Sequence, residues 1–235
     1  MMISSFYTAA TGTINLQKGF DVTANNIANV STTGYKTSEA SFADLMYTNI
    51  DAAQGANTKL KSGHGVKLKK TDTVFQPGGL KQTDRSLDYA LTANNEFFAV
   101  QTDGKVKYTR DGNFHLSLEN GTNYLTSSDR GYVLDAKGQK ITMNSENDSP
   151  AIGVFSFQNT DGLVREGGSY FTPSNNSGAA TALTNAEIKK GSLENSAVDL
   201  ADQMVSVIEL QRAFQLNSKI VQVSDEIMQT VNGLR

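Results

Sequence analysis

Apolar residues recur at helical spacing from Ser196 to Gly233, with no Gly or Pro between them. Ser196, followed by Asp199, resembles a capping box and predicts the start of a helix. The stripe consists of Leu200, Met204, Val207, Phe214, Val221 and Met228, with Gln211 and Ser218 at its two remaining positions. It is widened by Val205, Ile208, Ile220, Ile227, Val231 and Leu234. At ~1.5 Å per residue this helix is roughly 50 Å long, more than a domain of this size covers, so it needs a partner.

The N-terminal segment carries a second stripe, whose steps of three and four residues are typical of a coiled-coil seam. Its members are Phe6, Ala9, Thr13, Leu16, Phe20, Thr23, Ile27 and Val30. Gly12 and Gly19 each weaken an isolated helix by about 1 kcal/mol relative to Ala, so this segment should gain order by packing. The two stripes predict a coiled-coil stem formed by the two ends of the chain. A plain intramolecular helix pair is the simpler alternative, but the stripes are wide enough to be shared with neighbouring copies.

From Val66 the pattern changes to a period of two, which is typical of strands. Apolar runs flank Asp103-Gly104, a pair that favours a hairpin turn, and Asp111-Gly112 repeats the device. Short strands separated by such turns predict an all-β domain, either a small barrel or a sandwich. Polar, Gly-bearing residues 48–65 favour a loop or an extended arm, and residues 172–191 favour a return linker.

The predicted fold class is therefore α+β, with long terminal helices and a central all-β domain. The chain divides into an N-terminal helix with its following motif (1–36), an arm (37–80), a β-domain (81–172), a return linker (173–195) and a C-terminal helix (196–235).

Composition removes several classes of function. The 235 residues carry a net charge of −3, which gives no basic surface for nucleic acid and no polybasic membrane patch. No apolar run approaches the ~18 residues of a spanning helix, and residues 1–7 lack the features of a secretory signal. The absence of Cys excludes disulfides, thiolate metal sites and a Cys nucleophile.

Candidate chemistry is sparse. His64 and His115, the two histidines, stand at no spacing that groups them with carboxylates around a metal. The Asp-Gly pairs lie in no calcium-loop pattern, and the glycines form no phosphate-binding loop. Carboxylates are numerous enough for a glycosidase-type pair, but no pair stands in a recognisable setting. We therefore expect no enzyme activity, no metal and no cofactor.

A polar motif interrupts the first helical pattern at residues 24–36. Three Asn within five residues are unusual inside a helix, because their side chains compete for backbone hydrogen bonds. The stretch closely resembles the signature A-N-N-[IL]-A-N-x-x-T-x-G-[FY]-K of the bacterial flagellar rod and hook proteins. The matching residues are Ala24, Asn25, Asn26, Ile27, Ala28, Asn29, Thr33, Gly34, Tyr35 and Lys36.

Other segments resemble the same family. Tyr108–Gly112 is similar to a motif of its β-domain, and Gly191–Ser196 is similar to its G-x-L-E-x-S entry to the last helix. Gln211–Phe214 and Asn217–Lys219 match its Q-R-A-[FY] and N-S-K patterns. Phe42–Tyr47 and the opening residues are most similar to the distal-rod branch.

The resemblance implies a structural subunit of the basal-body rod that polymerises into a rigid tubular drive shaft and transmits motor torque to the hook. It implies proximal rod and hook proteins as partners at the ends of that polymer, with surrounding ring proteins as further candidates. It also implies export by the flagellar type III apparatus, without a cleaved signal peptide, to a place outside the cytoplasmic membrane. Neither nucleic acid nor membrane insertion is expected.

We expect the self-assembly interface to combine both stripes with the motif residues. Its predicted members are Phe6, Ala9, Thr13, Leu16, Phe20, Asn25, Asn26, Ile27, Ala28, Asn29, Val30, Thr33, Gly34, Tyr35, Lys36, Leu200, Met204, Val207, Gln211, Arg212, Phe214, Asn217, Val221 and Met228. A proximal rod or hook-like subunit is the alternative within the family, and the arm at 48–65 discriminates it. The alternative from another class is a secreted adhesin or β-rich enzyme with an oligomerising helical stem.

Overall fold

The computed structural model describes residues 2–49, 61–119, 121–143, 145, 148 and 150–234. The chain forms two compact units. The first, here called the helical unit, comprises Met1–Ile27, Ser38–Asp72 and Asp199–Arg235. The second, here called the β-unit, comprises Ala28–Thr37 and Thr73–Val198. No helix in the described part of the chain is long and apolar enough to cross a membrane.

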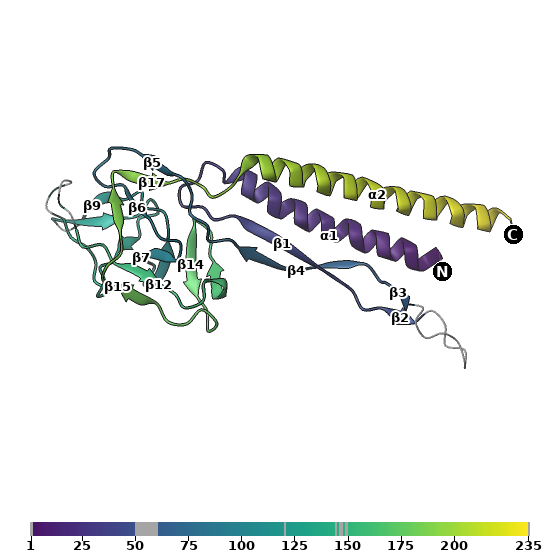
Figure 1. Ribbon diagram of the computed structural model, residues 1–235, viewed down its shortest axis with the longest axis horizontal. Helices are drawn as coiled ribbons and strands as arrows, with labels where there is room; N and C mark the ends of the chain where they lie inside the picture. The colour runs from purple at the N-terminus through teal and green to yellow at the C-terminus, as the bar shows by residue number, and fades with distance from the viewer. Residues whose placement is uncertain are drawn as a thin grey trace. The chain divides into compact units, whose positions relative to one another are not determined.

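The helical unit contains two long helices and a narrow β-ribbon (Figure 1). Helix α1 spans Met2–Ala28 and helix α2 spans Leu200–Gly233. The ribbon pairs strand β1 (Ser38–Asp44) with strand β4 (Val66–Thr73). Strands β2 (Thr48–Asn49) and β3 (Lys61–Ser62) pair with each other. Part of the predicted arm, residues 50–60, lies outside the described residues.

Helices α1 and α2 are antiparallel and meet at positions seven residues apart on both. The Nδ2 atom of Asn217 lies 3.1 Å from where a Cβ on Gly12 would be, and a Leu210 methyl lies 3.5 Å from the equivalent point on Gly19. One heptad further, the Nδ2 of Asn26 donates to the Oε1 of Gln203 at 2.9 Å. The glycines therefore permit a close approach between the helices. The finer coiled-coil geometry remains a prediction.

Helix α2 begins three residues later than its sequence predicts. Asp199 is the N-cap, since its side chain accepts from the backbone N–H groups of Ala201 and Asp202 at 2.8 and 3.4 Å. Ser196 instead accepts from the N–H of Val198 at 3.3 Å, which forms a local turn before the helix. The predicted capping box at Ser196 is therefore wrong, because the carboxylate of Asp199 caps the helix itself.

The β-unit is built on one large antiparallel sheet. Its main path runs β13-β14-β8-β7-β11-β10-β9, and β12 pairs with both β7 and β15. These strands are β7 (Glu96–Thr102), β8 (Lys105–Thr109), β9 (His115–Glu119), β10 (Thr122–Thr126), β11 (Tyr132–Val133), β12 (Val154–Ser156), β13 (Leu163–Arg165), β14 (Tyr170–Pro173) and β15 (Thr181–Leu183). A 3₁₀ turn at Thr160–Gly162 precedes β13. Two smaller pairs join β5 (Leu80–Gln82) to β17 (Ser192–Glu194) and β6 (Tyr89–Leu91) to β16 (Ile188–Lys190).

The hairpin predicted at Asp103-Gly104 is confirmed, and the one at Asp111-Gly112 is wrong. Thr102 pairs with Lys105, and Asp103 and Gly104 take φ values of 53° and 77°. At Asp111-Gly112 the chain instead crosses from β8 to β9, which pairs only with β10 along the sheet path. Gly112 is needed there because a Cβ would lie 1.7 Å from the carbonyl oxygen of Tyr89.

The large sheet separates two hydrophobic clusters. Phe98 belongs to one, with Phe114, Leu125 and Val133, whereas its neighbour Phe97 packs with Tyr108, Phe157 and Phe171 in the other. Adjacent strand residues point to opposite faces, so both faces of β7 are buried.

The α+β class is confirmed, but two finer expectations differ from the structure. The described strands form an open path from β13 to β9 and not the closed barrel that was one alternative. The predicted linker at 173–195 contains β15, β16 and β17. The Thr- and Ser-rich composition of this segment did not indicate these three short strands, because they pair with partners distant in sequence.

Candidate assembly interface

Helix α2 leaves most of its large apolar side chains exposed. Its face toward α1 combines the small and polar residues Gln203, Ser206, Ala213 and Asn217 with Leu210 and the half-buried Val207. The exposed apolar residues of α2 and its C-cap are Leu200, Met204, Val205, Ile208, Phe214, Leu216, Ile220, Val223, Ile227, Met228, Val231 and Leu234. Their side chains are 37–84% exposed. Such a continuous exposed apolar surface indicates an interaction site.

The predicted stripe of α2 therefore lies mostly beside its contact with α1. Leu200, Met204, Phe214 and Met228 are exposed, as are the polar members Gln211 and Arg212. Val207, Asn217 and Val221 are half-buried. The contact row differs from the predicted stripe by about one residue, because Gly12 and Gly19 allow Asn217 and Leu210 to approach α1 closely.

Helix α1 distributes its predicted residues in a similar way. Phe6, Asn25 and Ala28 are exposed, whereas Thr13, Leu16, Phe20 and Ile27 are half-buried. Asn29 and Val30, which follow the end of α1, are also half-buried. Ala9 and Asn26 are buried within the helical unit and offer no surface to a neighbouring copy. Tyr7 and Ile14 are also exposed and were not among the predicted interface residues, although they lie seven residues apart, as members of one helical stripe do.

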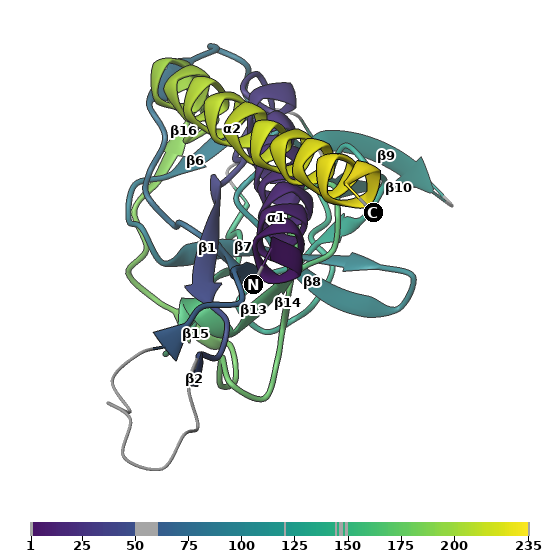
Figure 2. The ribbon, with the colours of Figure 1, turned by 90° about the vertical axis from the view of Figure 1, so that its right-hand side faces the viewer.

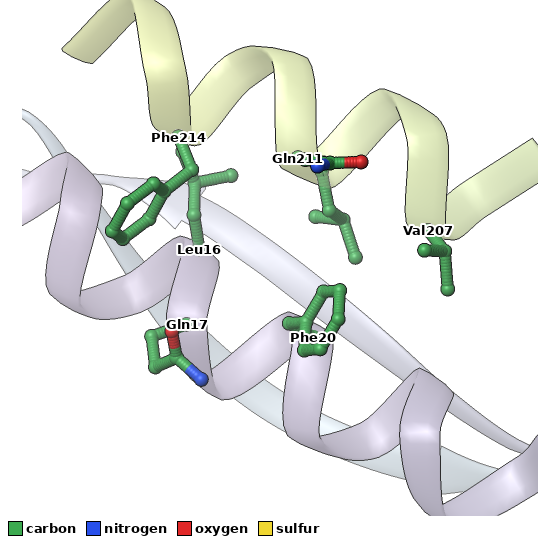
Figure 3. A pocket seen from close by; sticks show the side chains of 7 residues that line it. Leu16, Gln17, Phe20, Val207, Gln211 and Phe214 are labelled. Atoms are coloured by element: carbon green, nitrogen blue, oxygen red, sulfur yellow. The ribbon is translucent and has the colours of Figure 1, made fainter. Parts of the chain in front are cut away.

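An apolar hollow lies between the two helices (Figure 3). Leu16, Gln17 and Phe20 of α1 line it together with Val207, Leu210, Gln211 and Phe214 of α2. Its volume is about 230 Å³, and none of its lining residues is charged. The hollow therefore suits an uncharged side chain supplied from outside the helix pair.

The ribbon is held against α1 by two buried asparagines. The carboxamide of Asn15 donates to the carbonyl of Val66 at 2.9 Å and accepts from the N–H of Leu68 at 3.1 Å. Asn26 makes the same pair of bonds with the carbonyl and N–H of Ser38, at 2.8 and 3.0 Å. Both carboxamides thus satisfy strand backbone as another strand would.

An aromatic ring adds to this docking, and β1 lies beside α1 in both views of the chain (Figures 1 and 2). The ring of Phe42 lies 2.7 Å from where a Cβ on Gly19 would be, so a larger residue at position 19 would force the ring to move. The unusual Asn-rich motif therefore has a structural reason at Asn26, which joins α1, β1 and α2.

The second half of the motif belongs to the β-unit and is largely buried there. Gly34, Tyr35 and Lys36 are buried and present little surface to a neighbouring copy. Thr33 is half-buried and donates to the Oδ1 of Asp111 at 2.8 Å. The Nζ of Lys36 lies 2.6 Å from the Oε1 of Glu194, whose Oε2 lies 2.7 Å from the Nε of Arg110. All three charged side chains are buried.

The remaining polar atoms of this ion triad also have partners. The guanidinium of Arg110 donates to the carbonyls of Leu91, Ala93, Asn94 and Glu96 at 2.6–3.2 Å. Lys36 donates to the carbonyl of Gln76 at 2.5 Å, and the N–H of Gly78 donates to Glu194 at 2.8 Å. Burial and then repulsion from Arg110 lower the pKa of Lys36, against the attraction of Glu194.

The triad lies where the chain enters and leaves the β-unit. The N–H of Gly34 donates to the carbonyl of Glu194 at 2.9 Å, and the N–H of Ala197 donates to the carbonyl of Tyr35 at 3.0 Å. Gly34 has φ 63°, and a Cβ there would lie 2.6 Å from the carbonyl carbon of Arg110. Three motifs that were noted separately thus meet at one cluster. Arg110 and Glu194 were not among the predicted site residues, although each is a charged member of a motif.

The geometry offers little support for catalysis. Among the described residues, no three His, Cys, Asp or Glu side chains are grouped as metal ligands. His64 lies 2.9 Å from the hydroxyl of Thr48 on the exposed ribbon, and His115 is exposed on β9. The surface with the clearest functional potential is the exposed apolar part of the helices.

The two family models that match this chain cover the segments that contain most of α1 and α2. Residues 6–36 match the family model "Flagella basal body rod protein", and residues 189–234 match "Flagellar basal body rod FlgEFG protein C-terminal". The flagellar basal-body rod protein FlgG of Bacillus subtilis is 32% identical over 264 residues, covering 100% of both chains. FlgG of Buchnera aphidicola from Acyrthosiphon pisum is 31% identical, covering 99% of this chain and 100% of that one. The hook-basal body complex protein FlhP of B. subtilis is 29% identical, covering 100% of both chains.

Proposed function

The chain belongs to the family of flagellar basal-body rod proteins and is a structural subunit of the distal rod, and we propose that it polymerises through the exposed apolar surface of α1 and α2. The observation that supports this proposal is that α2 contacts α1 mainly through small and polar residues and Leu210, and leaves most of its large apolar residues exposed. A monomer gains nothing from this arrangement, because exposed apolar surface is stabilising only when a partner covers it.

We infer an open, helical polymer, because the exposed faces of α1 and α2 differ from each other. Contacts between two different faces of identical subunits are heterologous, and they continue into an open helical assembly when the rotation between subunits does not close a ring. Paired terminal helices of successive copies would then form a coiled-coil layer of a tube. Such a tube acts as the rigid shaft that transmits motor torque to the hook.

We further propose the partners and location that suit such a shaft. Proximal rod and hook proteins would contact its two ends, and ring proteins would surround it. The subunit would work outside the cytoplasmic membrane, after export through the flagellar type III apparatus. A proximal rod or hook-like role is not favoured, because the curated relatives that match along the whole chain include FlgG proteins from several bacteria.

Electron microscopy and sedimentation of the concentrated full chain test the proposed polymerisation. We expect tubes from the unaltered protein and monomers from the double variant Met204→Gln and Met228→Gln. Both methionines are exposed, and Gln keeps a high helix propensity, so the fold should persist. Leu118→Gln is the matched control, because Leu118 is exposed on β9 of the β-unit. Equal polymerisation by all three proteins would refute the role of the helices.

A further inference from the structure

A distinct apolar stripe, here called the C-terminal seam, runs along the last turns of α2. It consists of Leu216, Ile220, Val223, Ile227, Val231 and Leu234, at steps of four, three, four, four and three residues. Steps of three and four residues are typical of a coiled-coil seam, here with two consecutive steps of four from Val223 to Val231, and all six residues are 41–84% exposed. No charged side chain belongs to the seam. Its regularity indicates a helical or groove-shaped partner.

The C-terminal seam and the apolar hollow lie on opposite flanks of the row through which α2 contacts α1. That row passes through Gln203, Leu210 and Asn217. At about 100° per residue, Val207, Gln211 and Phe214 lie to one side of the row, and Leu216 and Val223 lie to the other. The helix pair therefore presents an apolar projection on one flank and an apolar recess on the other.

On the flank of α2 that carries the C-terminal seam, the residues change from charged to apolar along the helix. Asp202 and Glu209, two heptads and one heptad before Leu216, line the same hollow as Ser38, Glu39 and Phe42 of β1. Beyond that hollow the same heptad row continues as Leu216 and Val223. Polar residues thus occupy the row where the chain's own ribbon lies alongside, and exposed apolar residues occupy it further on.

The charges of α2 favour a second copy of this chain as the partner. The helix carries four acidic and two basic side chains, so it has no excess of cations to bind anionic lipid or nucleic acid. The hollow at Leu16, Phe20, Val207, Gln211 and Phe214 is also uncharged. An uncharged projecting stripe and an uncharged recess on one molecule complement each other between copies.

We propose that the C-terminal seam of one copy packs against the apolar hollow of a second copy. The contact is heterologous, so each copy still offers an unused seam and an unused hollow, and the chain of contacts continues. This assignment rests on the proposed self-assembly and specifies which face meets which. The competing arrangement pairs seam with seam, which would produce closed dimers.

Engineered disulfides distinguish the two arrangements, because the chain contains no Cys of its own. Gln211→Cys marks the hollow, and Leu216→Cys, Val223→Cys and Thr230→Cys mark the flank of the seam in separate full-length proteins. A disulfide needs Cα atoms within about 7 Å, so only residues that meet can cross-link. Lys219→Cys is the matched control, since it is exposed on α2 and faces away from α1.

Each protein is oxidised alone and in equimolar mixture with Gln211→Cys, and the same samples are examined for polymers by electron microscopy. We expect a mixed cross-linked dimer from at least one seam variant with Gln211→Cys, and at least tenfold less from Lys219→Cys. Cross-linked dimers from seam variants alone, without mixed dimers, would overturn the assignment. Polymers without any mixed cross-link would also overturn it and leave the proposed function standing. Absence of polymers from the unaltered chain would instead refute the proposed function.

Discussion

Replacing Glu194 by Gln tests the buried ion triad with almost no change of shape. Glu194 provides the one carboxylate between the ammonium of Lys36 and the guanidinium of Arg110. Gln retains an oxygen that can accept from Lys36 and Gly78, but it places an NH₂ group or a neutral oxygen against Arg110. The substitution therefore removes negative charge while preserving volume.

Breaking a buried ion pair by removing one partner costs about 3–5 kcal/mol, because the other charge remains buried. Here two cations lose their counterion, although the carbonyls around Arg110 satisfy its donors and Lys36 can lose its proton. We therefore expect the free energy of unfolding of the β-unit to fall by about 3–5 kcal/mol. At a urea m-value of about 2 kcal/mol/M, the midpoint would decrease by roughly 1.5–2.5 M.

Urea unfolding followed by the near-ultraviolet circular dichroism of tyrosine provides the assay. The chain has no Trp, and six of its eight Tyr lie in the β-unit, so the signal reports mainly on that unit. Glu166→Gln is the control, because the exposed Glu166 pairs with a half-buried Lys107 at the surface, and the expected change is within about 0.5 kcal/mol. A loss below about 1 kcal/mol for Glu194→Gln would refute the stabilising role of the triad.

Two further substitutions test the protonation of Lys36 and the role of Asn26 in docking α1. Because burial and Arg110 lower the pKa of Lys36, the unfolded chain binds more protons between the lowered and the ordinary pKa, so stability should rise with pH across that window. Lys36→Met should remove this rise, and equal urea midpoints against pH in both proteins would contradict the explanation. Asn26→Asp replaces a donor to Ser38 and Gln203 with a carboxylate, and should weaken the docking of α1 by about 1–3 kcal/mol. Hydrogen exchange along α1 measures this loss. Asn25→Asp, at an exposed position of the same helix, is the control. Unchanged exchange in both variants would exclude the proposed role of Asn26.

Local sequence patterns were enough to predict the large elements. Helical periodicity without Gly or Pro identified α2, and the Asp-Gly pair at 103–104 identified the β7–β8 hairpin, because both depend on neighbouring residues. The family motifs at both chain ends predicted membership in the rod proteins. Patterns failed where pairing depends on distant partners, as in the strands within 173–195 and the crossing at Gly112.

The division between buried and exposed apolar residues required the tertiary structure. Helix α2 has apolar residues around more than half of its circumference, so periodicity alone does not select the face that meets α1. Close packing at Gly12 and Gly19 selects it, and most of the large apolar residues other than Leu210 lie on the flanks.

The motif around residues 24–36 shows the same limit. Its sequence determined the family, but its residues serve two different units. Asn26 binds the ribbon and α2, whereas Lys36 is buried with Arg110 and Glu194, which are distant in sequence. A contiguous motif has no local signal for this separation, because the partners that bury a charge are brought together only when the chain folds.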